Sequence, residues 1–164
     1  MRIRILIADD HGLVAEGLQS LVAAHADFEV IGHASNGREA IQSALALKPD
    51  VVLMDVMMPE MNGIDATRAI RGRLPDTQVI MVSMHSNPEY AYRAIEAGAA
   101  GYLVKRSAAR ELFEAIHAVH AGRRYFSAQI AESVIERYVA GQAPQDPLDA
   151  LSARERQVLQ LLAE

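Results

Sequence analysis

The feature that most constrains this chain is a strict alternation of short apolar runs with segments of helical apolar spacing. Each of five apolar runs in residues 1–122 is followed by one such segment. Because parallel strands need a long crossover connection, the alternation predicts a parallel sheet with helices on both faces. The predicted strands are Ile3–Ala8, Phe28–Ala34, Val51–Met54, Thr77–Ser83 and Gly101–Val104.

Helix-end signals support the same order of elements. Asn36 and Glu39 have the spacing of a capping box, Asn87 and Pro88 favour a helix start, and Gly98 favours a helix end. We therefore predict a doubly wound α/β domain whose five-stranded parallel sheet has the order 2-1-3-4-5. Sheets of this kind place their functional sites at the carboxyl ends of the strands.

The alternation ends at Gly122, and the rest of the chain has a different organisation. Residues 123–140 predict a connecting helix, whereas residues 141–150 contain two prolines without apolar periodicity and predict a linker. Residues 151–164 begin another amphipathic helix with a capping-box start. We therefore expect a main domain over residues 1–122, followed by these three segments.

The composition excludes several classes of function. The chain has no cysteine and a net charge of −5, which excludes disulfides, thiolate zinc and a Cys nucleophile and gives no overall attraction for nucleic acid. The N-terminal apolar run stops at Asp9, too early for a signal peptide. No stretch reaches the roughly 18 apolar residues of a membrane span. We expect a cytoplasmic protein without membrane contact.

Charged side chains follow three of the predicted strands. Asp9 and Asp10 follow the first strand, Asp55 follows the third, and Lys105 follows the fifth. In a 2-1-3-4-5 sheet the first and third strands are neighbours, so the three carboxylates converge, and each raises the pKa of the others unless a cation intervenes. Lys105 supplies one positive charge, and an all-oxygen set of ligands predicts Mg²⁺ as the other cation.

Each of these residues alone is most often a helix cap or a turn residue. Their joint position, together with Ser83 at the end of the fourth strand, indicates phosphoryl chemistry. Asp55 is a candidate nucleophile that forms an aspartyl-phosphate, while Lys105 and Mg²⁺ neutralise the phosphoryl oxygens and Ser83 donates a hydrogen bond. Because the sequence has no glycine-rich phosphate loop, we expect a protein-bound or small-molecule phosphoryl donor.

These motifs together resemble the receiver domain of two-component response regulators. Residues 5–11 read ILIADDH, residues 55–63 read DVMMPEMNG and residues 101–105 read GYLVK, with Ser83 at its strand end. The resemblance covers residues 1–122 and implies a flavodoxin-like fold. It also implies that a sensor histidine kinase phosphorylates Asp55.

The resemblance implies roles for the other site residues as well. Asp10, Asp55 and the backbone carbonyl of Met57 would bind Mg²⁺ directly, with Asp9 assisting. Ser83 and Lys105 would contact the phosphoryl group, and Tyr102 would be the aromatic switch residue, turning from exposed to buried on phosphorylation. Arg106 stands where many receivers have a proline, but receivers of the NarL/FixJ type often lack that proline.

Residues 151–164, LSARERQVLQLLAE, resemble the first helix of the LuxR-type helix-turn-helix, although an ordinary amphipathic helix has a similar pattern. Together with the receiver this implies the NarL/FixJ family, in which phosphorylation controls homodimer formation and DNA binding. The recognition helix of that family lies beyond the position of Glu164. We therefore expect a truncated chain that can be phosphorylated but lacks the segment that reads DNA.

Two other function classes remain as alternatives. The first is a stand-alone receiver that acts by protein contact, which the segment 141–164 disfavours. The second is a phosphatase of the haloacid dehalogenase type, which needs a second Asp two residues after its nucleophile; Met57 stands there instead. We therefore expect no enzyme beyond slow self-phosphorylation and self-dephosphorylation. His117 and His120, spaced i and i+3, are interpreted as surface residues rather than metal ligands.

Overall fold

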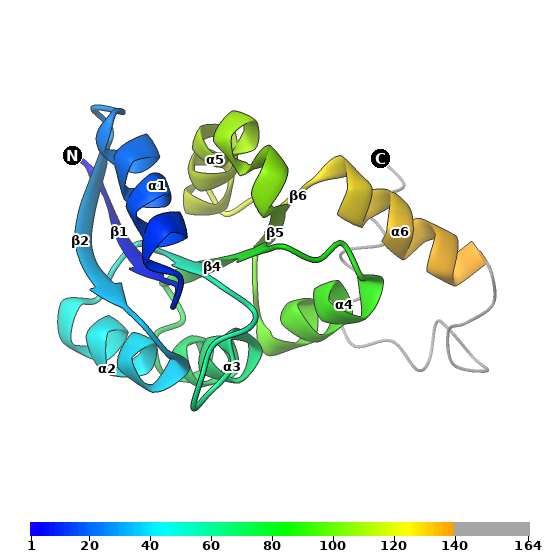
Figure 1. The fold of residues 1–164 in the computed structure, drawn as a ribbon, viewed down its shortest axis with the longest axis horizontal. Helices are drawn as coiled ribbons and strands as arrows, with labels where there is room; N and C mark the ends of the chain where they lie inside the picture. The colour runs from blue at the N-terminus through cyan, green and yellow to red at the C-terminus, as the bar shows by residue number, and fades with distance from the viewer. Residues whose placement is uncertain (140–164) are drawn as a thin grey trace.

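The computed structural model describes residues 1–139 and contains a parallel sheet in the order β2-β1-β3-β4-β5-β6 (Figure 1). The strands are β1 Ile3–Ala8, β2 Phe28–Ala34, β3 Val51–Met54, β4 Gln78–Ser83, β5 Gly101–Val104 and β6 Tyr125–Phe126. The helices are α1 Gly12–Ala23, α2 Gly37–Leu47, α3 Gly63–Arg73, α4 Pro88–Ala97, α5 Lys105–His120 and α6 Ala128–Val139.

The sheet lies between two layers of helices. Helices α1 and α5 cover one face, and α2, α3 and α4 cover the other (Figure 1). Side chains of β1 alternate between the two cores: Ile5 and Ile7 face α1 and α5, whereas Leu6 and Ala8 join the opposite cluster. This burial on both faces explains why the strands read as continuous apolar runs.

The predicted helix ends are confirmed at α2 and α4. The Asn36 side chain accepts a hydrogen bond from the Glu39 backbone N–H at 2.9 Å and donates one to the Glu39 carboxylate at 2.9 Å. Asn87 caps α4 by accepting from the Glu89 N–H, and Gly98 ends it with a φ of 111°. A positive φ of this size favours glycine because it has no side chain.

The sheet has one strand more than the sequence predicts. Tyr125 and Phe126 pair in parallel with Gly101 and Tyr102, within a segment predicted to belong to the connecting helix. The pairing is fixed by backbone hydrogen bonds, including Ser127 N–H to the Tyr102 carbonyl at 2.9 Å. A strand of two residues has no periodicity to detect, and it forms only because the edge of β5 is available.

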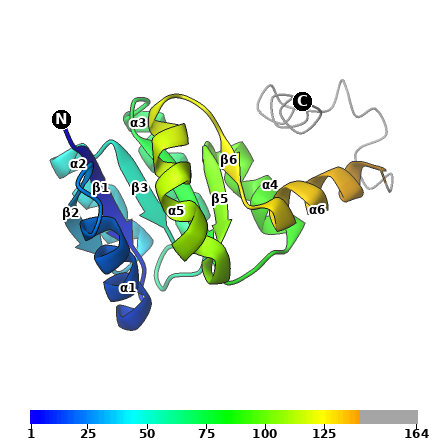
Figure 2. The same cartoon turned by 90° about the horizontal axis from the view of Figure 1, so that it is seen from above.

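Helix α6 packs against α4 and β5 at the β6 end of the sheet (Figures 1 and 2). Ile130 on α6 is fully buried in the same apolar cluster as α4 residues such as Ala91 and Ala94. The predicted linker 141–150 and the predicted helix 151–164 lie outside the described residues. Within residues 1–139, no helix has the length and apolar character required to span a membrane.

Candidate functional site

Two carboxylates meet at the carboxyl ends of neighbouring strands. Asp9 follows β1 and Asp55 follows β3, and Ala8 and Met54, the residues before them, are partners in the parallel pairing. The Asp55 backbone N–H donates to the Ala8 carbonyl at 2.9 Å, which holds the two strand ends together. The side chains are only 1% and 5% exposed, whereas Asp10 is more open to solvent.

Lys105 brings a positive charge to these carboxylates from the far side of β4. It is the first residue of α5, immediately after β5. Its Nζ lies 3.0 Å from Oδ2 of Asp9 and 3.3 Å from Oδ2 of Asp55, and its side chain is nearly buried. A buried cation between two buried carboxylates offsets part of their repulsion. The predicted convergence of the three carboxylates Asp9, Asp10 and Asp55, with the positive charge of Lys105 beside them, is confirmed.

The environment raises the pKa of the Asp55 carboxyl above its ordinary value of 3.8. Burial is the largest cause and the charge of Asp9 is the second, while Lys105 and the backbone N–H of Met57 act in the opposite direction. The carboxylate therefore carries its negative charge at an energetic cost. An additional cation close to Asp55 reduces that cost.

His11 is a site residue that the sequence analysis did not assign. Its Nδ1 lies 3.3 Å from Asp9 Oδ1, 3.2 Å from Asp10 Oδ1 and 3.7 Å from Asp55 Oδ2. Its backbone N–H also donates to Asp9 Oδ1 at 2.8 Å. The histidine follows the two aspartates directly in the sequence, but its side-chain contacts depend on the turn between β1 and α1, which apolar spacing does not reveal.

These groups have the donor set of a site for a hard divalent cation. Ligand atoms of Asp9, Asp10, His11 and Asp55 all lie within 4.8 Å of one another. Oδ2 of Asp9 and Oδ2 of Asp55 are buried and, among the described residues, accept no hydrogen bond of good geometry, so the Lys105 charge is their main electrostatic partner. Carboxylate oxygens are the ligands that Mg²⁺ prefers, so the residues present fit that ion.

The loop after Asp55 is held close to the strand end by a glycine. The Gly63 N–H donates to the Val56 carbonyl at 2.9 Å. A Cβ atom on Gly63 would lie 1.9 Å from the Asp55 carbonyl oxygen, which is an impossible contact. Glu60 has a φ of 66°, and the Met61 N–H donates to the Pro59 carbonyl at 2.7 Å across it. The start of α3 therefore fixes the backbone that carries Asp55.

Ser83 and Tyr102 meet at the loop between β4 and α4. Ser83 Oγ accepts a hydrogen bond from the His85 N–H at 3.0 Å, and the Tyr102 hydroxyl donates to the His85 carbonyl at 3.1 Å. The Tyr102 ring is fully buried. Burial also raises the pKa of Tyr102 above 10.0, so the hydroxyl remains a donor at neutral pH. The ring has the buried orientation, and its switching remains a prediction.

Residues 5–117 match the family described as the response regulator receiver domain. The chain belongs to this family. The response regulator is 41% identical over 156 residues to response regulator GacA of Pseudomonas viridiflava, an alignment that covers 95% of this chain and 73% of GacA. It is 40% identical over 162 residues to the transcriptional regulatory protein LiaR of Bacillus subtilis strain 168, with 99% of this chain and 77% of LiaR covered.

Solved structures give the same assignment for the response regulator. A two-component response regulator of the LuxR family from Aurantimonas sp. SI85-9A1 superimposes with a TM-score of 0.81 at 37% identity, over 85% of this chain and 99% of that one. The receiver domain of the NarL response regulator from Mycobacterium tuberculosis gives a TM-score of 0.71 at 36% identity, over 74% of this chain and 98% of that one. The response regulator is therefore of the NarL/FixJ type.

Proposed function

We propose that Asp55 is the phosphoacceptor of a two-component phosphorelay and that a sensor histidine kinase is its donor. The observation that carries the proposal is the buried Asp55 carboxylate held beside Asp9 and Lys105 at the carboxyl edge of the sheet. An oxygen of Asp55 attacks the phosphorus of a phosphohistidine. The new P–O bond forms as the P–N bond breaks, and the imidazole of the kinase leaves with the bonding electron pair and takes up a proton.

The neighbouring residues support this transfer electrostatically. Asp9, Asp10, Asp55 and the carbonyl of Met57 would hold Mg²⁺, which supplies positive charge to the phosphoryl oxygens. The ammonium group of Lys105, already at 3.3 Å from Asp55, pairs with a phosphoryl oxygen as it arrives. Ser83 donates its hydroxyl proton to another oxygen, and that proton is available because its Oγ acts as an acceptor toward His85.

We further propose that the signal leaves the site through the loop after β4. Ser83 and Tyr102 both bond to the backbone of His85, so a movement of Ser83 toward the phosphoryl group displaces the loop that Tyr102 holds. This loop leads directly into α4. The output is homodimer formation and DNA binding through the C-terminal region, and thus regulation of transcription, consistent with the name of the relative LiaR.

The first test is phosphorylation by acetyl phosphate in the presence of Mg²⁺, followed by intact-mass measurement. We expect a gain of one phosphoryl group in the wild-type protein and none in Asp55→Asn. Asp76→Asn, which changes an exposed aspartate near the opposite edge of the sheet, is the matched control and should be labelled like the wild type. Labelling of Asp55→Asn would refute the assignment, and labelling in excess chelator would refute the metal requirement.

A further inference from the structure

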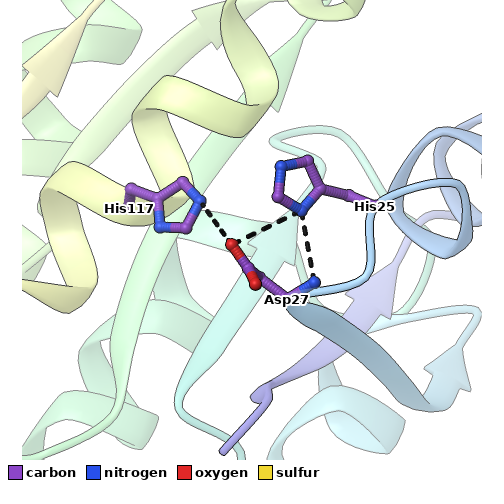
Figure 3. Close-up of side chains that lie close together, drawn as sticks. All are labelled: His25, Asp27 and His117. Carbon is purple, nitrogen blue, oxygen red and sulfur yellow. Dashed lines mark hydrogen bonds and ion pairs between the residues drawn. The ribbon is translucent and has the colours of Figure 1, made fainter.

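A second cluster of polar side chains consists of His25, Asp27 and His117 (Figure 3). His25 follows α1, Asp27 immediately precedes β2, and His117 lies in the last turn of α5. Because all strands of the described sheet are parallel, the start of β2 lies on the side of the sheet where the strands begin, whereas the carboxyl end of β3 lies on the side where they end. The cluster is therefore separate from Asp55 and takes no part in the proposed phosphorylation.

The Asp27 carboxylate lies between the two imidazole rings. Its Oδ2 is 3.7 Å from His25 Nδ1 and 3.6 Å from His117 Nε2. One ligand atom from each of the three residues lies within 4.8 Å of the other two. Their side chains are between 34% and 61% exposed, so a solvated ion can reach them.

The hydrogen bonding of His25 determines which atom faces the carboxylate. The Asp27 backbone N–H donates to His25 Nδ1 at 3.3 Å, so Nδ1 has its lone pair, not a proton, on that side. The same Nδ1 faces Oδ2 of Asp27, which is also an acceptor. A metal ion bound at Nδ1 would use the lone pair that accepts this hydrogen bond, so the ion would replace the Asp27 N–H as the partner of His25.

Aromatic side chains fix the orientation of both histidine rings. The His25 ring stacks on Phe28 with centroids 4.5 Å apart and an interplanar angle of 22°, and it contacts Phe113 at 5.0 Å. The His117 ring also lies 5.0 Å from Phe28. These contacts reduce the rotamer freedom that the imidazoles would lose on coordination, so the cluster is preorganised.

We propose that His25, Asp27 and His117 form a binding site for a divalent transition-metal ion of the zinc class. Metal–nitrogen and metal–oxygen bonds of about 2.0–2.2 Å place tetrahedral ligand atoms roughly 3.4 Å apart. The two separations from Asp27, 3.6 and 3.7 Å, need to shorten by a few tenths of an ångström, and the two imidazole ligand atoms, which lie within 4.8 Å of each other, approach as the ion binds. Two imidazoles and one carboxylate favour Zn²⁺ over Mg²⁺, and water completes the coordination.

The fold gives His117 a different histidine neighbour from the one that the sequence spacing suggests. The i, i+3 spacing associates His117 with His120 on one helix, whereas the fold brings His117 to His25, which is remote in sequence. His120 is exposed and outside the cluster of three ligands. A bound ion would connect the end of α1, the start of β2 and the end of α5, and would therefore stabilise the packing of α1 and α5 on the sheet.

The test is a calorimetric titration of the full chain with Zn²⁺ in millimolar Mg²⁺, which competes for the acidic site. We expect one Zn²⁺ per chain from the cluster and an increase in the melting temperature, because the ion binds the folded state. His117→Gln and His25→Gln should each weaken this binding by at least about tenfold. His120→Gln is the matched control on the same helix, and Asp55→Asn is the control for the acidic site.

Both controls should bind Zn²⁺ like the wild type. Equal binding by His117→Gln and the wild type would overturn the proposal, as would the absence of saturable binding in Mg²⁺. Loss of binding in Asp55→Asn but not in His117→Gln would assign the ion to the acidic site and would also overturn it. Because all three ligands are partly exposed, we expect the variants to fold, and circular dichroism checks this.

Discussion

Tyr102 connects the sheet to a surface loop through one hydroxyl group. The ring is fully buried, while its oxygen donates to the carbonyl of His85 in the exposed loop between β4 and α4. The same loop residue donates its N–H to Ser83. One residue of the loop is therefore held by two side chains, one from the end of β4 and one from β5.

Replacing Tyr102 by Phe removes this hydroxyl and retains the buried ring. We expect the free energy of unfolding to fall by about 0.5–1.5 kcal/mol, the usual contribution of one hydrogen bond. Amide exchange in residues 84–87 should become faster, while phosphorylation of Asp55 proceeds. Urea unfolding and exchange mass spectrometry measure the two effects. Unchanged exchange in the loop would show that the hydroxyl does not hold it.

Tyr102→Ala is a less specific variant because it also empties the ring position. Large-to-small substitutions of this kind cost about 3–5 kcal/mol through lost burial and the cavity that remains. If this variant no longer dimerises on phosphorylation, either the lower stability of the fold or the missing switch side chain could be the cause. The comparison with Tyr102→Phe separates the two.

At the scale of elements, the contact between α3 and β3 fixes the phosphoacceptor strand end. Gly63 is the first residue of α3, and its Cα is so close to the Asp55 carbonyl that no Cβ fits there. Thr67, one turn later, donates its hydroxyl proton to the Gly63 carbonyl at 2.7 Å. The position of Asp55 therefore depends on the small size of one residue in a neighbouring helix.

We expect Gly63→Ala to displace the start of α3 and to lower both stability and the rate of phosphorylation by acetyl phosphate. The contacted atom is backbone, so the strain cannot be relieved by a side-chain rotation. Gly72→Ala is the matched control in the same helix, because nothing lies within 4 Å of its Cβ position. That control should gain roughly 0.5–1 kcal/mol from helix propensity. Thermal unfolding and labelling rates distinguish the variants, and equal behaviour would contradict the contact.

Apolar spacing and cap residues predict most of the elements because they are local properties of the chain. The meeting of Asp9, Asp55 and Lys105 was also predictable, since parallel strands place their carboxyl ends at one edge. The strand β6 could not be predicted, because two residues form a strand only through pairing with β5. The position of His11 among the carboxylates was missed for a similar reason: it depends on the path of a turn.

For the whole molecule, the buried negative charge of Asp55 lowers the stability of the fold. Burial and Asp9 raise the pKa of Asp55 in the folded state above 3.8. A raised pKa means that Asp55 contributes stability when it is protonated, below its pKa in the unfolded chain. This contribution is lost as the pH rises through the folded-state pKa. At neutral pH, the ionised Asp55 therefore destabilises the fold in the absence of a metal ion.

We therefore expect Asp55→Asn to unfold at a higher temperature than the wild type in chelator at pH 7. A gain of about 1 kcal/mol would correspond to roughly 2–4 °C in Tm. The difference should shrink as the pH falls, and Mg²⁺ should raise the Tm of the wild type more than that of the variant. Scanning calorimetry at several pH values checks this, and a variant less stable at pH 7 would contradict it.

The two edge strands of the described sheet differ in length, and this affects how readily the protein aggregates at high concentration. β2 is an edge strand of seven residues with a register irregularity opposite Ile5 and Leu6, whereas β6 has only two residues. Long, regular edges offer unpaired amides to other chains and promote aggregation, and bulges and short edge strands suppress it. The small β6 therefore shields the apolar strand β5 from edge-to-edge association. Deleting Tyr125 and Phe126 would expose β5 and shorten the lifetime of the protein in solution.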